Sequence, residues 1–344
     1  MAAIAAVRAG SPPAPSTPRM LAVGSGGNKF IELLEEVRVL RNAGQDWDTL
    51  AGISAGALLC GMVSMLPYGA LEPFNAKLAD ATRQFAEDTR ASPFRPWVPL
   101  GAYASALFAV LFQKPALFRG NTDWVRKKFD PRQFHASGRR LMVGVFDNTL
   151  QKYKTVDSRF HGARDLGLAI AASAAVPVVC PPVLDAHKHL CRDGGMVHSI
   201  PSREIVAWVR GHGRQRVHVD LLISDALETA PAPSEKTTVT SSLTDMCTSL
   251  VWRNLQNDLR YLVCKLLADK PGDAERVLWA LRTGKQRNFE RPWGTMRVVS
   301  PVDLGPRRRV RTGFRVPRRQ TTRQLRAAGV RAAQAALGYT QVES

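Results

Sequence analysis

A strand, a glycine turn and a helix occur twice in succession near the start of the chain, and few folds accommodate this order. The first unit is RMLAVGSGG followed by KFIELLEEVRVLRNAG, in which Ile31, Leu34 and Val37 fall on one helical face. The second is WDTLAGI followed by SAGALLCGMVSML, which ends at Pro67. Two strands that each lead into a helix predict a parallel α/β sheet with ligand-binding turns at the carboxyl ends of its strands.

The rest of the chain continues with strands and helices. Residues 71–129 are expected to be mostly helical. Expected strands are RLMVGVFDN, QKYKTVDS, KHLCRDGG and VHVDLLIS, and expected helices among them are ARDLGLAIAASAAVP and SREIVAWVRGHG. Beyond a Pro/Ser/Thr-rich stretch we expect further helices from residue 243, a last strand in MRVVSPV and an amphipathic helix in TTRQLRAAGVRAAQAAL.

Ser54 lies between Gly52 and Gly56 in the segment GISAG. A strand that turns sharply into a helix leaves no room for side chains two positions on either side of the turning residue, which is then presented as a nucleophile. The same letters also fit a small residue at the start of a packed helix. The neighbouring segments decide between these interpretations.

The turn GSGGNKF, residues 24–30, offers one of the groups that a reactive serine needs. Acyl transfer requires a base for the hydroxyl proton and preorganised donors for the oxyanion. Backbone N–H groups of small residues at the start of a helix are such donors, because the helix dipole also favours negative charge there. The glycine patterns of nucleotide-binding loops do not fit this turn, which argues against a phosphate site.

The residues alone leave two kinds of base open. Asp193 lies in CRDGGMVHSIP at the end of an expected strand, although Asp-Gly-Gly is also a common turn. The other kind is a histidine, as in the α/β-hydrolase order of serine, acid and histidine, and His198, His212 and His218 come late enough for this. That fold usually places several strands before its serine, whereas only one expected strand leads up to the elbow strand here.

Alternating polar residues in DAHKHLCRD resemble metal ligands on one strand face. They are Asp185, His187, His189, Cys191 and Asp193. Consecutive ligands on one strand are too far apart to close a tetrahedron without a turn, so we interpret them as an exposed polar face. We expect no metal and no cofactor.

The charge of the chain favours an anionic partner. Lys and Arg number 48 against 29 Asp and Glu, which gives a formal net charge of +19. Much of the excess lies in GPRRRVRTGFRVPRRQTTRQLR, which begins at Gly305. A phospholipid surface and a nucleic acid both fit this charge, and a solvated basic tail is the third interpretation.

Cysteine use and the first residues bear on the compartment. Five scattered cysteines without a CxxC pair argue against a disulfide framework and favour a reducing, intracellular compartment. The leader is rich in Pro and Ser and lacks the apolar core of a signal peptide, so we expect it to be disordered. The longest apolar run, Tyr103 to Phe112, is too short to cross a bilayer. We expect no transmembrane helix, and peripheral membrane association is open.

Taken together, these segments resemble the patatin-like phospholipase family. GISAGAL matches its nucleophile elbow, DGG at Asp193 matches its catalytic aspartate motif, and AIAASAAVPVVCPPV resembles its alanine- and serine-rich helix. The resemblance implies the family's three-layer α/β/α sandwich with a mostly parallel central sheet, here followed by a helical C-terminal region and a basic tail. We expect a disordered leader over 1–19, a catalytic domain over 20–228, a linker over 229–242, a mainly helical region over 243–304, and a basic segment with a closing helix over 305–344.

The resemblance also implies roles for individual residues. Ser54 would be the nucleophile and Asp193 its partner in a Ser–Asp dyad, with the amides of Gly26 and Gly27 as the oxyanion hole. A dyad without histidine requires the aspartate both to accept the serine proton and to return it, which favours a partly buried carboxylate with a raised pKa. The residues that support these motifs are Gly52, Gly56, Lys29, Gly194 and Gly195.

Three positions depart from the family pattern. The family's glycine loop usually reads GGG-x-[KR]-G, and here Ser25 replaces its first glycine and Phe30 its last. Ser199 stands in place of the asparagine that usually follows the DGG. None of these changes removes a reacting group.

The resemblance implies a lipid acyl hydrolase of the phospholipase A or lysophospholipase type. It would cleave carboxylic esters of phospholipids or other lipids through an acyl-enzyme, at an anionic membrane surface. The alternative is a non-enzymatic protein that binds nucleic acid or membrane through its basic residues on a patatin-like core. Salt-sensitive binding to RNA or DNA without esterase activity would favour the alternative.

Overall fold

A computed structural model gives the fold. The structure describes residues 17–26, 29–66, 68, 76, 114, 128–177, 180–224, 227, 239–301 and 319–338. Several expected features lie wholly or mostly outside these residues, namely the leader, the helical stretch over 71–129, its apolar run at 103–112, the linker over 229–242 and the basic stretch at 305–318.

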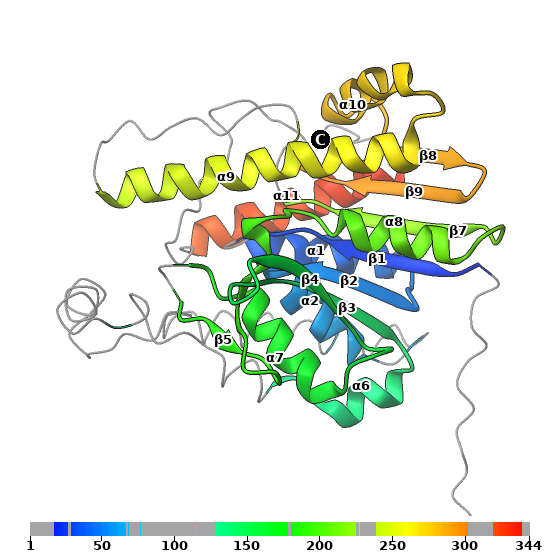
Figure 1. Cartoon of the computed structure of the whole chain (residues 1–344). Coiled ribbons are helices and arrows are strands. Elements are labelled where there is room, and N and C mark those ends of the chain that lie inside the picture. The colour runs from blue at the N-terminus through cyan, green and yellow to red at the C-terminus, as the bar shows by residue number, and fades with distance from the viewer. Residues whose placement is uncertain are drawn as a thin grey trace, which may run out of the picture.

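Within the described residues, nine strands form one sheet (Figure 1). Its order is β5-β6-β3-β2-β1-β7-β9-β8, with β4 paired to β3 off this path. The strands are β1 (Arg19–Val23), β2 (Thr49–Ile53), β3 (Arg140–Asp147), β4 (Lys152–Asp157), β5 (Val183–Leu184), β6 (Leu190–Asp193), β7 (Val217–Leu222), β8 (Asn288–Arg291) and β9 (Gly294–Val299). The central run β3-β2-β1-β7-β9 is parallel, and the pairs that involve β4, β5, β6 or β8 are antiparallel.

The strand β1 shows why helices cover both faces of this sheet. Its side chains alternate between two hydrophobic clusters, with Leu21 and Val23 in one and Met20 and Ala22 in the other. A parallel strand that is apolar on both faces needs a helical layer on each side.

The helices divide between the two faces accordingly. One cluster includes residues of α1 (Phe30–Asn42), α2 (Ala55–Ser64), α6 (Pro131–Ser137), α7 (Ala163–Ser173) and α11 (Arg319–Leu337). The other includes residues of α8 (Ser202–Gly211), α9 (Val239–Leu262) and α10 (Ala274–Arg282). Figure 1 shows α9 beside α8 and α11 beside α1. The predicted three-layer α/β/α sandwich with a parallel centre is therefore confirmed.

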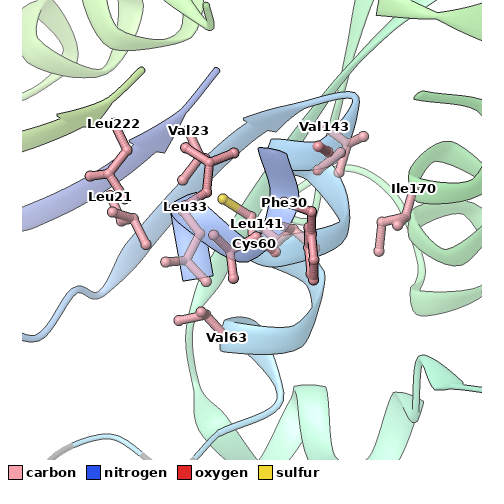
Figure 2. Packing of buried hydrophobic residues seen from close by; sticks show 14 of the residues in the cluster. Leu21, Val23, Phe30, Leu33, Cys60, Val63, Leu141, Val143, Ile170 and Leu222 are labelled. Carbon is pink, nitrogen blue, oxygen red and sulfur yellow. The ribbon is translucent and has the colours of Figure 1, made fainter. Parts of the chain in front are cut away.

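The first cluster fixes the two helices that follow the glycine turns. Figure 2 shows Leu33 of α1 and Cys60 and Val63 of α2 gathered beneath Leu21 and Val23 of β1. All five side chains are fully buried. Because α2 begins directly after Ser54, this packing also fixes the position of the serine.

The C-terminal part of the chain extends the same sheet and the same core. The expected strand MRVVSPV corresponds to β9, which pairs in parallel with β7 from Val217↔Gly294 to Leu222↔Val299. β5, β8 and α6 have no counterpart among the elements expected from the sequence. The helix α9 begins at Val239, inside the stretch expected as a linker. No helix among the described residues is long and apolar enough to cross a membrane.

Candidate active site

Two strands end head to head on one edge of β3, and this brings Ser54 and Asp193 together. β2 runs parallel to β3 and ends where Ile53 pairs with Gly144. β6 runs antiparallel to β3 and ends where Asp193 pairs with Val145. β4 pairs with β3 over both stretches, so it occupies the opposite edge and β2 and β6 share one line. Ser54, the next residue after β2, therefore faces the end of β6.

The two side chains are hydrogen-bonded to each other. The Ser54 hydroxyl donates to Asp193 Oδ2 over 2.8 Å. Both residues are buried, at 6% and 5% exposure. Ser54 has φ 57° and ψ −123°, a backbone conformation that non-glycine residues rarely adopt and that turns the strand sharply into α2.

The glycines around Ser54 are required by close backbone contacts. A Cβ on Gly56 would overlap the carbonyl oxygens of Val23 and Gly24, and a Cβ on Gly52 would overlap the backbone of Gly56. The elbow therefore lies directly against the end of β1. This is the geometry that the spacing of GISAG predicts.

The carboxylate of Asp193 is held at its other oxygen by the turn that follows it. Asp193 Oδ1 accepts the N–H of Gly195 over 2.7 Å. Gly194 lies so close to the backbone of Gly144 that a Cβ there would overlap it. Burial raises the pKa of Asp193 from 3.8 to about 7, although the bonds from Gly195 and Ser54 lower it. The carboxyl group can thus change protonation state near neutral pH.

Ser173 is a site residue that the sequence analysis did not single out. Its hydroxyl accepts the backbone N–H of Ser54 over 2.8 Å and donates to the carbonyl of Gly144 over 2.7 Å. Ser173 is the last residue of α7 and is fully buried. The only signal in the sequence is a lone serine in the alanine-rich helix AIAASAAVP.

The glycine turn lies beside the aspartate turn. The N–H of Gly24 donates to Leu222 of β7, and the N–H of Ser25 donates to the carbonyl of Ser199 over 2.7 Å. A Cβ on Gly195 would lie 3.4 Å from Ser25 Cβ, so the two turns are in contact.

Two residues of the glycine turn bear on the expected oxyanion hole. Among the described residues, none accepts a hydrogen bond from the N–H of Gly26. Gly27 lies outside the described residues. The Lys29 ammonium donates a hydrogen bond to the carbonyl of Ser224 over 2.9 Å, which connects the start of α1 to the segment after β7.

The three histidines considered as triad members bond elsewhere. His198 Nδ1 lies 2.6 Å from Asp258, and His212 Nδ1 lies 2.8 Å from the carbonyl of Trp208. His218 contacts Asp220 and Thr295. Within the described part of the chain, Asp193 is the hydrogen-bond partner of the Ser54 hydroxyl, and none of these histidines is.

The polar residues of DAHKHLCRD separate in the structure. Asp185 and His189 gather with Asp147, their ligand atoms within 4.8 Å of one another. The ammonium of Lys154 lies among them, 2.8 Å from Asp147 and 2.6 Å from Asp185. The Lys154 ammonium thus forms an ion pair with each of the two carboxylates of this cluster. Asp193 belongs to the site described above.

Comparison with known proteins identifies the class of this α/β sandwich. The model of the patatin-like phospholipase family matches residues 21–205, more than half of the chain. The chain therefore belongs to the patatin-like phospholipase family, as the resemblance implied.

Two further comparisons were made. Among solved structures, the chain is similar to VipD from Legionella pneumophila, with 12% sequence identity, a TM-score of 0.40, and coverage of 95% of this chain and 68% of that chain. A comparison with curated proteins found no match.

Proposed function

We propose that this protein hydrolyses carboxylic esters of lipids, as a phospholipase A or lysophospholipase, with Ser54 as nucleophile and Asp193 as base. The observation that carries the proposal is the 2.8 Å hydrogen bond from the Ser54 hydroxyl to Asp193 Oδ2. A serine hydroxyl is a weak nucleophile unless an adjacent base accepts its proton. The buried carboxylate is positioned for that role.

The proposed reaction has two similar halves. The Ser54 oxygen attacks the ester carbonyl carbon while its proton passes to Asp193, and the carbonyl oxygen becomes an oxyanion. The tetrahedral intermediate then expels the alcohol, which takes the proton from Asp193 and leaves the acyl group on Ser54. Water attacks the acyl-enzyme in the same way, which releases the fatty acid and restores the serine hydroxyl.

The proposed oxyanion hole is formed by the amides of Gly26 and Gly27. The N–H of Gly26 has no acceptor among the described residues and precedes the N-terminus of α1, which supports this role for Gly26. The position of Ser25 against Gly195 places the glycine turn next to the aspartate turn. The contact between the two turns supports a role for the Gly26 amide close to the proposed base.

The pKa of Asp193 suits its double task. A carboxyl group whose pKa is about 7 is ionised in a large fraction of molecules at neutral pH, so it can accept the serine proton. Its conjugate acid is also acidic enough to return the proton to the alcohol. An aspartate with an ordinary pKa would accept the proton far less readily. No histidine is required by this arrangement, and we expect no metal requirement.

The proposed substrate is a phospholipid or another lipid ester, because the chain belongs to a phospholipase family. The net charge of +19 favours an anionic membrane surface as the place of reaction, with nucleic acid as the weaker alternative. Binding to vesicles should then strengthen with anionic lipid content and weaken with salt.

Labelling with a fluorophosphonate tests the proposal without knowledge of the substrate. Wild type should react covalently at Ser54, and Ser54→Ala should not. Ser64→Ala is a matched control, because Ser64 is also buried but its hydroxyl donates within α2, to the carbonyl of Gly61. Addition of a chelator should leave the labelling rate unchanged. Unlabelled wild type that binds RNA in a salt-sensitive way would contradict the proposal and favour a non-enzymatic role.

A further inference from the structure

The segment that follows the aspartate turn is bound by a single buried carboxylate of α9. Asp258 Oδ2 accepts the backbone N–H of Ser199 over 2.6 Å and that of Ile200 over 3.2 Å. Asp258 Oδ1 contacts His198 Nδ1 over 2.6 Å and the hydroxyl of Ser202 over 3.3 Å. The residue is 3% exposed, so these four contacts are made away from water.

Two other residues of α9 reach the same segment. The side-chain amide of Asn254 donates to the carbonyls of Gly195 and Met196, over 3.2 and 2.8 Å. The carbonyl of Val251 accepts the hydroxyl of Ser199 over 2.6 Å. Positions 251, 254 and 258 lie on one side of a helix, so α9 presents one polar edge to the aspartate turn. This helix lies beyond the residues that match the family.

The backbone of Ser199 connects α9 to the glycine turn as well as to the aspartate turn. Its N–H binds Asp258, while its carbonyl accepts the N–H of Ser25 in the glycine turn. The two backbone segments are packed closely, because a Cβ on Gly24 would lie only 2.9 Å from the Ser199 carbonyl oxygen. Movement of Ser199 would displace the glycine turn, the aspartate turn or both.

We propose that Asp258 is a positioning residue that sets the spacing between Asp193 and the amides of the glycine turn. This inference rests on the proposed function of these two turns. A buried carboxylate that accepts several N–H donors makes strong, charge-assisted hydrogen bonds. Its removal leaves two backbone donors unsatisfied, and a displacement of about 1 Å at reacting groups costs about 10²-fold in rate.

The first experiment compares labelling rates for each folded protein. Asp258→Ala should react with fluorophosphonate about 10²-fold more slowly than wild type. Asp258→Asn should retain most of the rate, because its amide oxygen still accepts the two backbone N–H groups and its NH₂ can donate to His198. Asp220→Ala is the control, since Asp220 is a buried carboxylate of β7 that also pairs with a histidine, His218.

The control separates positioning from stability. Asp220→Ala should lower the melting temperature, as Asp258→Ala does, yet label at the wild-type rate when folded. Folded Asp258→Ala that labels at the wild-type rate would overturn the inference. So would an equal loss of rate in both alanine variants, because the effect would then be general.

A second measurement does not depend on activity. Hydrogen exchange at the amides of Ser25 and Gly195, neither of which bonds to Asp258, should accelerate in Asp258→Ala and stay unchanged in Asp220→Ala. Unchanged exchange at both amides would overturn the inference even if wild type proved inert. Absence of labelling in wild type with accelerated exchange would instead count against the proposed function alone.

Discussion

The elbow at Ser54 and the turn at Asp193 meet at one hydrogen bond, but different forces hold them. The elbow is shaped by steric contact, since Gly52 and Gly56 allow backbone segments to touch, and Ser173 adds a single pair of hydrogen bonds. The aspartate turn also has a steric contact, at Gly194, but α9 adds hydrogen bonds from Asn254 to the turn and from the segment after it to Asp258. The elbow therefore depends mainly on local shape, whereas the aspartate turn depends in addition on a helix that is distant in the sequence.

Removal of the base should have the largest effect on activity. Asp193→Asn should lower kcat/KM for a short-chain nitrophenyl ester by about 10²–10⁴-fold, because general-base assistance contributes about that much to the rate. A serine hydroxyl without a base is a weak nucleophile. The variant should remain folded, as judged by a cooperative thermal unfolding transition. Activity within tenfold of wild type would remove Asp193 from the mechanism.

The same variant should be more stable than wild type at alkaline pH. The pKa of Asp193 is about 7 in the folded protein against 3.8 for an ordinary aspartate, so the folded state loses stability as pH rises between these values. Asparagine carries no such charge. The melting temperature of Asp193→Asn should therefore exceed that of wild type at pH 8, and the difference should shrink at pH 5.

A methyl group at Gly56 tests the steric half of the comparison. Gly56→Ala should force the backbone of the elbow away from β1, lowering stability by about 1–3 kcal/mol and labelling at Ser54 by about 10²-fold. Gly211→Ala is the control, because nothing lies within 4 Å of a Cβ at that position in α8. Thermal unfolding and fluorophosphonate labelling measure both effects. A fully active Gly56→Ala would show that the elbow tolerates displacement.

The rate should depend on pH through Asp193. The base form is the active form, so kcat/KM should reach a plateau above a pKa of about 7 and fall about tenfold for each pH unit below it, to about 10⁻² of the plateau at pH 5. A pH profile of ester hydrolysis by the folded protein measures this. A flat profile from pH 5 to pH 8 would mean that another group accepts the proton.

Loss of the Ser173 hydroxyl should have a smaller effect. Ser173→Ala removes two hydrogen bonds, the one from the N–H of Ser54 and the one to the carbonyl of Gly144, which should cost about 1 kcal/mol of stability each and lower the labelling rate about tenfold. Ser64→Ala, which removes a buried hydroxyl remote from the elbow, should keep the wild-type labelling rate. Equal labelling of the two variants would show that glycine contacts alone hold the elbow.

The histidine variants should show the smallest effects. His198→Ala, His212→Ala and His218→Ala should each keep activity within about tenfold, or 1.4 kcal/mol of barrier. His198→Ala should lose most of the three, because His198 contacts Asp258. One folded histidine variant as inactive as Ser54→Ala would replace the dyad with a triad, whose members act as a unit.

The parts of this molecule that could be predicted from the sequence are those determined by residues close together in the chain. Buried runs of apolar residues predicted β1 and β2, and the spacing of Gly52 and Gly56 around Ser54 predicted the elbow because sterics act over a few residues. β5 and β8 were missed because strands of two and four residues carry almost no alternation.

The partners that orient the site had no such local signal. Ser173 lies 119 residues from Ser54, and Asp258 lies 59 residues from Ser199. A single hydrogen bond between positions so far apart leaves no periodic pattern in a sequence. Only the fold shows that one serine in an alanine-rich helix and one aspartate in α9 are bound to the candidate site.

The arginine-rich stretch between β9 and α11 is anchored at both ends. β9 ends at Val299 within the sheet, and α11 packs against α1 with Ala332, Ala333 and Ala336 fully buried. The sequence between residues 302 and 318, which contains six arginines, therefore joins two elements that are both packed into the fold. The charge of these arginines is best tested by substitution or internal shortening, because ending the chain at Gly305 would also remove α11 and expose the apolar face of α1.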